Sequence, residues 1–284
     1  MKNFVRSNMA FIVWLVLCMS FYFLLFHGAM NVFLVIVIVH LISLTIAFSP
    51  LGEWAMRLID GVRKIEIYGE VSYIYPLFTE VYYEAAKHNP KLSQKIEVFI
   101  KDEAAINAYT YGSNTIIITR GALESLGEDQ MKGLIAHEFG HLANGDTRIK
   151  LALTIGGGFF SIFYVVLNGI IRLLNFFIRV FYFKTLLSLY NLLFVYPLRF
   201  IRFVLVKTIW LFQTASALLI GLGSRNNQYR ADEFACTAGY KEHLLSSLYA
   251  LHEMNIIGSA SLMEHLKSGS PHIASRIARL ERMN

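Results

Sequence analysis

Two histidines and a glutamate in the segment Met131–Leu142 have the spacing of a metal site. His137, Glu138 and His141 form an H-E-x-x-H sequence inside an amphipathic run. On an α-helix, residues four apart lie one turn above each other, so both imidazoles can point at one ion. A tetrahedral Zn²⁺ accepts such ligands and lowers the pKa of bound water to about 7. Glu138 is turned away from the ligand direction but is close enough to hold that water.

This motif predicts hydrolysis of a peptide bond with one zinc ion. His137 and His141 would be metal ligands, and Glu138 the general base that later returns a proton to the leaving amine. The alternative is a chance pair of surface histidines on an ordinary helix, in a chain that has 9 histidines among 284 residues. The segments around the motif favour the zinc site.

The composition indicates a membrane protein with one water-facing domain. Hydrophobic residues make up 55% of the chain and charged residues 16%, against about 45–50% and about 25% in soluble domains. The net charge of +6 does not predict nucleic-acid binding, because the basic residues flank apolar runs. Cys18 and Cys236 fit neither a disulfide framework nor a thiolate zinc site, which favours a reducing compartment.

Four uncharged runs predict transmembrane helices, because a hydrocarbon core needs about 20 apolar residues. Residues 9–26 and 28–48 form a pair whose outer flanks are basic and whose connector is not, which places both flanks in the cytoplasm. A cleaved signal peptide is the alternative for the first run, and the second run disfavours it. Residues 151–171 and 208–223 predict further spans, with basic interfacial or partly buried pieces between them.

The chain therefore divides into four predicted regions. These are 1–48 with two transmembrane helices, 49–150 with the strands and zinc helix of the catalytic domain, 151–223 with at least two spans and basic interfacial pieces, and 224–284 with the second part of the catalytic domain and a helical tail.

The segment before the zinc helix predicts a small sheet. Val71–Lys87 predicts a helix, Lys95–Ile100 a strand, and Ile106–Gly112 a turn rich in small and polar residues. A second strand follows at Thr115–Thr119, and we expect its free edge to bind an extended substrate by β-augmentation. The substrate strand then consists of Thr115, Ile116, Ile117, Ile118 and Thr119. The alternative is two plain core strands.

The order Asn107-Ala-Tyr, Gly112, Ile116-Ile-Ile-Thr-Arg-Gly-Ala122 and His137-Glu-Phe-Gly-His-Leu-Ala-Asn-Gly-Asp146 resembles the HtpX-type membrane zinc metalloproteases, relatives of the CAAX prenyl proteases. The resemblance implies a mainly α-helical integral membrane protein with about four transmembrane helices. Its catalytic domain would be a zincin-like (gluzincin) α+β domain with a small sheet. It also implies misfolded or damaged membrane proteins as substrates, and a bacterial cytoplasmic (inner) membrane with the catalytic domain on the cytoplasmic side.

One position departs from the resembled family. There, a helix after the last span carries a glutamate as third zinc ligand and, four residues later, a supporting aspartate. Asp232 is present and can accept the free ring N–H of a ligand histidine, but Gln228 stands in the ligand position. The amide oxygen can still reach zinc, without the negative charge. Glu233 is a possible substitute ligand, but a turn of about 100° per residue places it away from Gln228.

Three hypotheses for Gln228 stay open: an engineered inactivating change, a natural variant with altered metal affinity, and a pseudoenzyme. The intact Glu138 and histidines count against a decayed site, and we favour the engineered change.

In the tail, the sequence predicts helices at Tyr240–Met254, Ser261–Lys267 and Ile273–Arg282. Further site candidates by resemblance are Asn107, His272 and Arg276, the last two in transition-state roles. A basic packing helix is the alternative for the last two.

The sequence thus predicts a membrane-embedded zinc endopeptidase of protein quality control. Its partners would be the bilayer and membrane-protein or unfolded-peptide substrates, without nucleic acid. The alternative is a catalytically dead membrane adaptor that keeps the peptide-binding groove. A small transporter ranks last, because the predicted spans carry only His40 and Lys207 as ionisable residues of the kind that marks a path.

Overall fold

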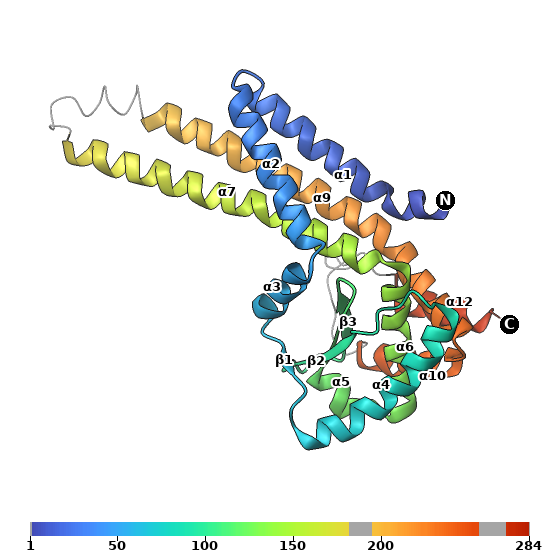
Figure 1. Cartoon of the computed structure of the whole chain (residues 1–284). Helices are drawn as coiled ribbons and strands as arrows, with labels where there is room; N and C mark the ends of the chain where they lie inside the picture. The colour runs from blue at the N-terminus through green and yellow to red at the C-terminus, as the bar shows by residue number, and fades with distance from the viewer. Residues whose placement is uncertain (1, 182–194, 256–270, 284) are drawn as a thin grey trace.

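The computed structural model describes residues 2–181, 195–255 and 271–283. Four long helices form a bundle, and a smaller α/β domain lies at one end of it (Figure 1). The bundle helices are α1 (Lys2–Phe26), α2 (Met30–Ala47), α7 (Asp146–Phe181) and α9 (Tyr196–Thr237). The predicted helix at Ser261–Lys267 and part of the predicted interfacial pieces lie outside the described residues.

The α/β domain contains the remaining described elements. Its helices are α3 (Pro50–Asp60), α4 (Tyr68–His88), α5 (Arg120–Ser125), α6 (Glu128–Asn144), α10 (Lys241–Asn255) and α12 (Ile273–Glu281). Its strands are β1 (Arg63–Lys64), β2 (Glu97–Lys101), β3 (Ala108–Tyr111) and β4 (Thr115–Thr119), in the spatial order β1-β2-β4-β3. The predicted mainly helical fold with a small sheet is therefore confirmed.

The zinc-motif helix α6 has clear start and stop signals. Glu128 and Asp129 place negative charge in its first turn, where the helix dipole is positive. The side chain of Gln130 accepts a hydrogen bond from the backbone N–H of Gly127 at 3.0 Å. The helix ends at Gly145, whose φ of 70° is left-handed and is adopted readily only by glycine. This turn leads the chain into α7.

The prediction of a turn at Ile106–Gly112 is wrong, because Ala108–Tyr111 form strand β3. Ala108 pairs with Ile118 and Tyr111 with Thr115 in an antiparallel ladder. Burial alternates along the strand, as a period of two requires. Ala108 and Thr110 suggested a turn, but Tyr109 and Tyr111 alternate with them and suit a strand that pairs with β4 and contacts α6.

The prediction of a free edge on Thr115–Thr119 is also wrong. The residues form β4 as predicted, but β2 pairs with one side in parallel and β3 pairs with the other in antiparallel. All five residues are buried, as expected for a central strand. Within the described residues, β3 is the outermost strand on the side of α6.

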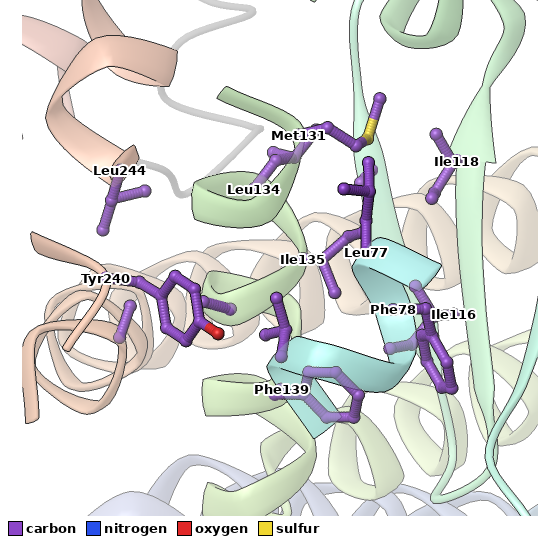
Figure 2. Close-up of a cluster of buried hydrophobic side chains, with 14 of the residues drawn as sticks. Leu77, Phe78, Ile116, Ile118, Met131, Leu134, Ile135, Phe139, Tyr240 and Leu244 are labelled. Atoms are coloured by element: carbon purple, nitrogen blue, oxygen red, sulfur yellow. The ribbon is translucent and has the colours of Figure 1, made fainter. Parts of the chain in front are cut away.

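The hydrophobic core lies between one face of this sheet and helices α4, α6 and α10. Ile116 and Ile118 of β4 belong to one cluster with Phe78 of α4 and Phe139 of α6, and in Figure 2 Ile116 lies by Phe78 while Ile118 lies on the side of Met131. The rings of Phe78 and Phe139 lie 5.3 Å apart between centroids, a favourable aromatic contact. On the other side of α6, Leu244 of α10 completes the cluster. This packing fixes α6 against the sheet and so fixes the motif.

Among the described residues, no single helix has both the length and the apolar composition needed to cross a membrane. The pair Phe33–Ala47 and Pro50–Asp60, bent by 81°, meets the requirement together, and Phe11–Phe23 is a shorter apolar helix. The four predicted spans therefore stay a prediction.

Candidate metal centre

Helix α6 presents the three motif residues at one buried point. His137 and Glu138 are each 4% exposed and His141 is 8% exposed. One ligand atom from each of the three lies within 4.8 Å of the others. The two imidazole centroids are also 4.8 Å apart. The spacing read from the sequence therefore gives a convergent cluster of donor atoms, which the fold shields from water.

A close approach of α9 to α6 brings two more polar side chains to His137. The helices touch at Gly140, where an added Cβ would lie 2.7 Å from the Cα and carbonyl oxygen of Ala231. Only a residue without a side chain fits there. Oε1 of Gln228 lies 3.0 Å from Nε2 of His137, and Oδ1 of Asp232 lies 2.8 Å from Nδ1 of the same ring.

Each histidine has a carboxylate at Nδ1. Asp232 stands at His137, and Oδ2 of Asp146 lies 3.0 Å from Nδ1 of His141. A ring N–H that donates to these carboxylates leaves Nε2 of both rings with a free lone pair for a metal. No role was predicted for Asp146 from the sequence. Its signal is its place directly after Gly145, whose left-handed turn folds the chain back onto His141.

The structure places Gln228, and not Glu233, beside the ligand histidines. Glu233 forms an ion pair with Arg279 of α12 on the surface, where both side chains are 43% exposed. A substitute-ligand role for Glu233 therefore has no geometric support. Residue 228 faces Nε2 of His137, where the resemblance implied a third ligand.

The remaining candidates differ in position. Arg276 of α12 makes a double contact with Asp232, through Nε to Oδ2 at 2.9 Å and Nη2 to Oδ1 at 2.6 Å. Its Nη2 also lies 3.2 Å from Nδ1 of His137. His272 is exposed at the N-terminal end of α12. Asn107 is exposed at the start of β3, and its backbone N–H donates to Thr119 Oγ1 at 2.9 Å.

The electrostatics of the site favour neutral His137 and ionised Asp232. Burial lowers the pKa of His137, and the guanidinium of Arg276 lowers it further. Burial would raise the pKa of Asp232, but the hydrogen bond from the His137 ring and the charge and hydrogen bonds of Arg276 outweigh it and hold the pKa well below its usual range. Burial also lowers the pKa of His141, yet the hydrogen bond and charge of Asp146 outweigh it and raise that pKa.

These residues fit a zinc ion. The two imidazoles converge with a carboxylate oxygen of Glu138, Oε1 of Gln228 lies beside Nε2 of His137, and the imidazoles are held by carboxylates as in known zinc sites. Oε2 of Glu138 is buried and has no hydrogen-bond partner within the described part of the chain. A buried oxygen without a partner is costly unless a ligand or water completes the site. The donor set and this orphaned oxygen together point to a cation with a polar ligand beside it.

Buried histidines on a helix, supported by carboxylates and flanked by a glutamate, define a metallopeptidase by fold and site. Residues 78–284 match the model of Peptidase family M48, so the chain belongs to that family. The predicted class of enzyme, a metallopeptidase with an H-E-x-x-H motif, is therefore confirmed. The family also implies a metal ion.

The chain is similar to several proteins named protease HtpX homolog. The chain is 31% identical over 110 residues to a protease HtpX homolog from Bacteroides fragilis (strain YCH46), covering 37% of this chain and 32% of that protein. It is 27% identical over 197 residues to the homolog from Bordetella avium (strain 197N), covering 64% and 62%. The chain thus spans less than two thirds of each of these relatives. The predicted relationship to HtpX-type proteases is confirmed.

A solved structure shares the fold. The crystal structure of S. mikatae Ste24p superposes with a TM-score of 0.53 at 18% sequence identity. The match covers 99% of this chain and 65% of that chain. The bundle and the α/β domain therefore both belong to the shared architecture.

Substitution of Gly140 by alanine is expected to damage the centre without touching a ligand. The new Cβ must push α9 away from α6, because the atoms it meets belong to the backbone of Ala231. Overpacking of this kind costs about 1–3 kcal/mol, and a displaced Asp232 weakens zinc binding by about 10–100-fold. The measurements are the thermal unfolding midpoint in detergent and a zinc titration.

The matched control is Gly69→Ala in α4, where nothing lies within 4 Å of the added Cβ. It should leave zinc affinity unchanged. If Gly140→Ala behaved like Gly69→Ala in both measurements, the close contact of α6 and α9 would not be what positions residues 228 and 232.

Proposed function

We propose that the chain is a membrane-embedded zinc endopeptidase that cleaves membrane proteins in protein quality control. The catalytic domain would face the cytoplasm at a bacterial inner membrane. The observation that carries the chemistry is the pair of carboxylate-held histidines beside the unpartnered oxygen of Glu138. The experiment that tests the chemistry is the Glu138 substitution described in the Discussion.

Three side chains of this site would hold the metal. His137 and His141 would offer Nε2, and Gln228 would offer Oε1. When bound, a zinc ion supplies Lewis-acid chemistry: it polarises a carbonyl group and lowers the pKa of a water molecule to about 7. Asp232 and Asp146 keep the histidine rings oriented and fix the tautomer of each neutral ring, with the proton on Nδ1 and the lone pair on Nε2.

Glu138 would handle the proton. Its buried Oε2 accepts a proton from the attacking water and later returns it to the leaving amine. Arg276 acts as a positioning residue, because its guanidinium holds both oxygens of Asp232, which in turn holds His137. The domain boundaries at 48, 150 and 223 remain part of this proposal, with the site assembled from the second and fourth regions.

The substrate would pair with β3 and not with β4 (Thr115–Thr119), the strand predicted from the sequence. An extended peptide can add to the outer edge of a sheet through main-chain hydrogen bonds. β3 (Ala108–Tyr111) is the outer strand of the described sheet and contacts the motif helix α6. A backbone paired there would lie at the edge of the strand that contacts α6, the helix that carries Glu138.

A second function, the catalytically dead adaptor, is favoured by one observation. The side chain facing Nε2 of His137 is the uncharged amide of Gln228. A site with two neutral imidazoles and an amide has no protein charge among its ligands to offset Zn²⁺. Such a chain could keep the groove along β3 with little turnover, and whether the glutamine is natural or engineered does not change this expectation.

The proposed topology predicts the labelling of single cysteines in intact cells. The positions are Lys91 before β2, Ser275 on α12 and Ala29 in the connector of the first two spans, all exposed, in a chain with Cys18 and Cys236 replaced by serine. An impermeant thiol reagent should label the cysteine at 29 and neither of the others. Labelling of only one of the cysteines at positions 91 and 275 would contradict a shared site. Labelling of both would show that the orientation in the membrane is opposite to the predicted one.

A further inference from the structure

The short helix α3 has its polar side turned toward the protein and its apolar side turned outward. Glu53, Arg57 and Asp60 lie on one face of the helix, because positions three, four and seven apart share a face. The opposite face carries Leu51, Trp54 and Leu58, which are 62%, 54% and 62% exposed. A helix packed on a soluble domain normally shows the reverse arrangement.

Glu53 makes the inner side of α3 part of the sheet. Its Oε1 accepts a hydrogen bond from the backbone N–H of Ser113 at 2.7 Å, and its Oε2 accepts one from Thr115 Oγ1 at 3.0 Å. Gly112, with φ of 58°, lies so close that an added Cβ would be 2.1 Å from the Glu53 carboxylate. The turn between β3 and β4 is therefore held against this helix.

Arg57 and Asp60 extend the same contact. Nη1 of Arg57 donates to Thr115 Oγ1 at 2.9 Å. Asp60 Oδ2 accepts from the hydroxyls of Tyr109 and Tyr111 of β3, each at 2.6 Å. The polar face of α3 is thus committed to β3 and β4, and rotation of the helix to hide its apolar face would break these bonds.

The approach of α3 from α2 sets its direction. The two helices are bent by 81° at a short break, where Ser49 Oγ accepts from the N–H of Leu51 at 3.2 Å and Pro50 begins the helix. Figure 1 shows α3 at the base of α2, where the bundle meets the α/β domain. If α2 crosses the bilayer, a helix nearly perpendicular to it runs along the membrane surface.

We propose that α3 is a membrane-surface helix whose occupant is the phospholipid bilayer itself. Leu51, Trp54, Leu58 and Ile59, the last 78% exposed, would lie among the headgroups and upper acyl chains, where amphipathic helices bury their apolar face by about 5–10 Å. Tryptophan is enriched at that depth. The inference rests on the membrane location in the proposed function.

This placement has a consequence for the substrate. Because Glu53 and Asp60 tie α3 to the outer strand and its turn, β3 is held at a fixed height next to the lipid surface. A polypeptide segment that leaves the bilayer would meet the edge of β3 as soon as it becomes extended. The helix therefore favours substrates tethered to the membrane.

The test measures the depth of single tryptophans in vesicles of phosphatidylcholine and phosphatidylglycerol. The full chain carries Trp14→Phe and Trp210→Phe, so that Trp54 is the only tryptophan. Lipids brominated near the headgroup or near the chain end quench by contact. Two matched variants in a Trp54→Phe background place the probe elsewhere: Ile38→Trp on the exposed face of α2 and Tyr83→Trp on α4, where residues 38 and 83 are 55% and 63% exposed.

Trp54 should be quenched at least about twofold more by the shallow than by the deep bromines. Ile38→Trp should show the opposite order, and Tyr83→Trp should respond to aqueous iodide and to neither lipid. If neither brominated lipid quenches Trp54, then water or a second copy of the chain covers the residue. That result overturns the inference about α3 but leaves the proposed membrane location standing. If Trp54 lies as deep as the tryptophan of Ile38→Trp, α2 and α3 together form one bent span. This result also overturns the inference.

Failure of the proposed membrane location gives a different result, since Ile38→Trp would then escape both brominated lipids. Trp14 is 1% exposed, so its replacement could disturb folding. In that case the difference in emission between the parent chain and Trp54→Phe reports the same depth.

Discussion

Replacement of Glu138 by glutamine is expected to lower peptide cleavage by about 10²–10⁴-fold, the contribution of a general base. Bound zinc should stay nearly unchanged, because the side chain handles the proton and the imidazoles hold the ion. Glutamine has nearly the same shape as glutamate, but its amide cannot accept a proton near neutral pH. The measurement is the turnover of a fluorogenic peptide together with zinc content, in whichever background, the chain as given or Gln228→Glu, shows measurable cleavage.

Glu233→Gln is the matched control for this substitution. It removes a carboxylate of the same size from an exposed position that pairs with Arg279, so turnover should stay within about twofold of the parent. Cleavage by Glu138→Gln within about tenfold of the parent would contradict the general-base assignment.

Restoration of a carboxylate at position 228 is expected to raise cleavage from little or nothing to a clear level. Oε1 of Gln228 already lies 3.0 Å from Nε2 of His137, so glutamate needs no new geometry and adds only charge. A carboxylate ligand offsets the positive charge of Zn²⁺ and links α9 to α6 through the metal. The zinc affinity should therefore rise by about 10–100-fold. The measurement is turnover of the same peptide by the two chains at equal zinc.

Asn226→Asp is the control for added charge, because residue 226 is exposed on the same helix and faces away from position 228. It should give no gain. If Gln228→Glu also gave none, residue 228 would not be a working ligand position, and the adaptor hypothesis would replace the protease.

The motif could be predicted because its information is local. His137, Glu138 and His141 lie within five residues on one amphipathic helix, so periodicity alone places their side chains. The strand at Thr115–Thr119 was equally readable from its β-branched residues. Gln228 and Asp232 lie about ninety residues after the motif in the sequence. Only the family resemblance assigned them to the site.

What the sequence did not predict depends on long-range packing. Strand β3 is only four residues long and alternates Ala108 and Thr110 with two tyrosines, and its place at the sheet edge follows from pairing with β4 and contact with α6. Asp146 reaches His141 only because Gly145 turns the chain back. For α3, the pattern marks two faces but cannot say which one meets the protein, and here the polar face does.

Zinc content of the purified chain tests the central claim most directly. The chain as given, Gln228→Glu and Gln228→Glu with His141→Ala are purified without chelator, analysed for metal, and then challenged with a competing chelator. We expect about one zinc ion per Gln228→Glu chain, faster loss of zinc from the chain as given, and no bound zinc in the variant that lacks His141. Equal retention by the first two chains, or zinc that survives removal of His141, would contradict a centre built from His137, His141 and residue 228.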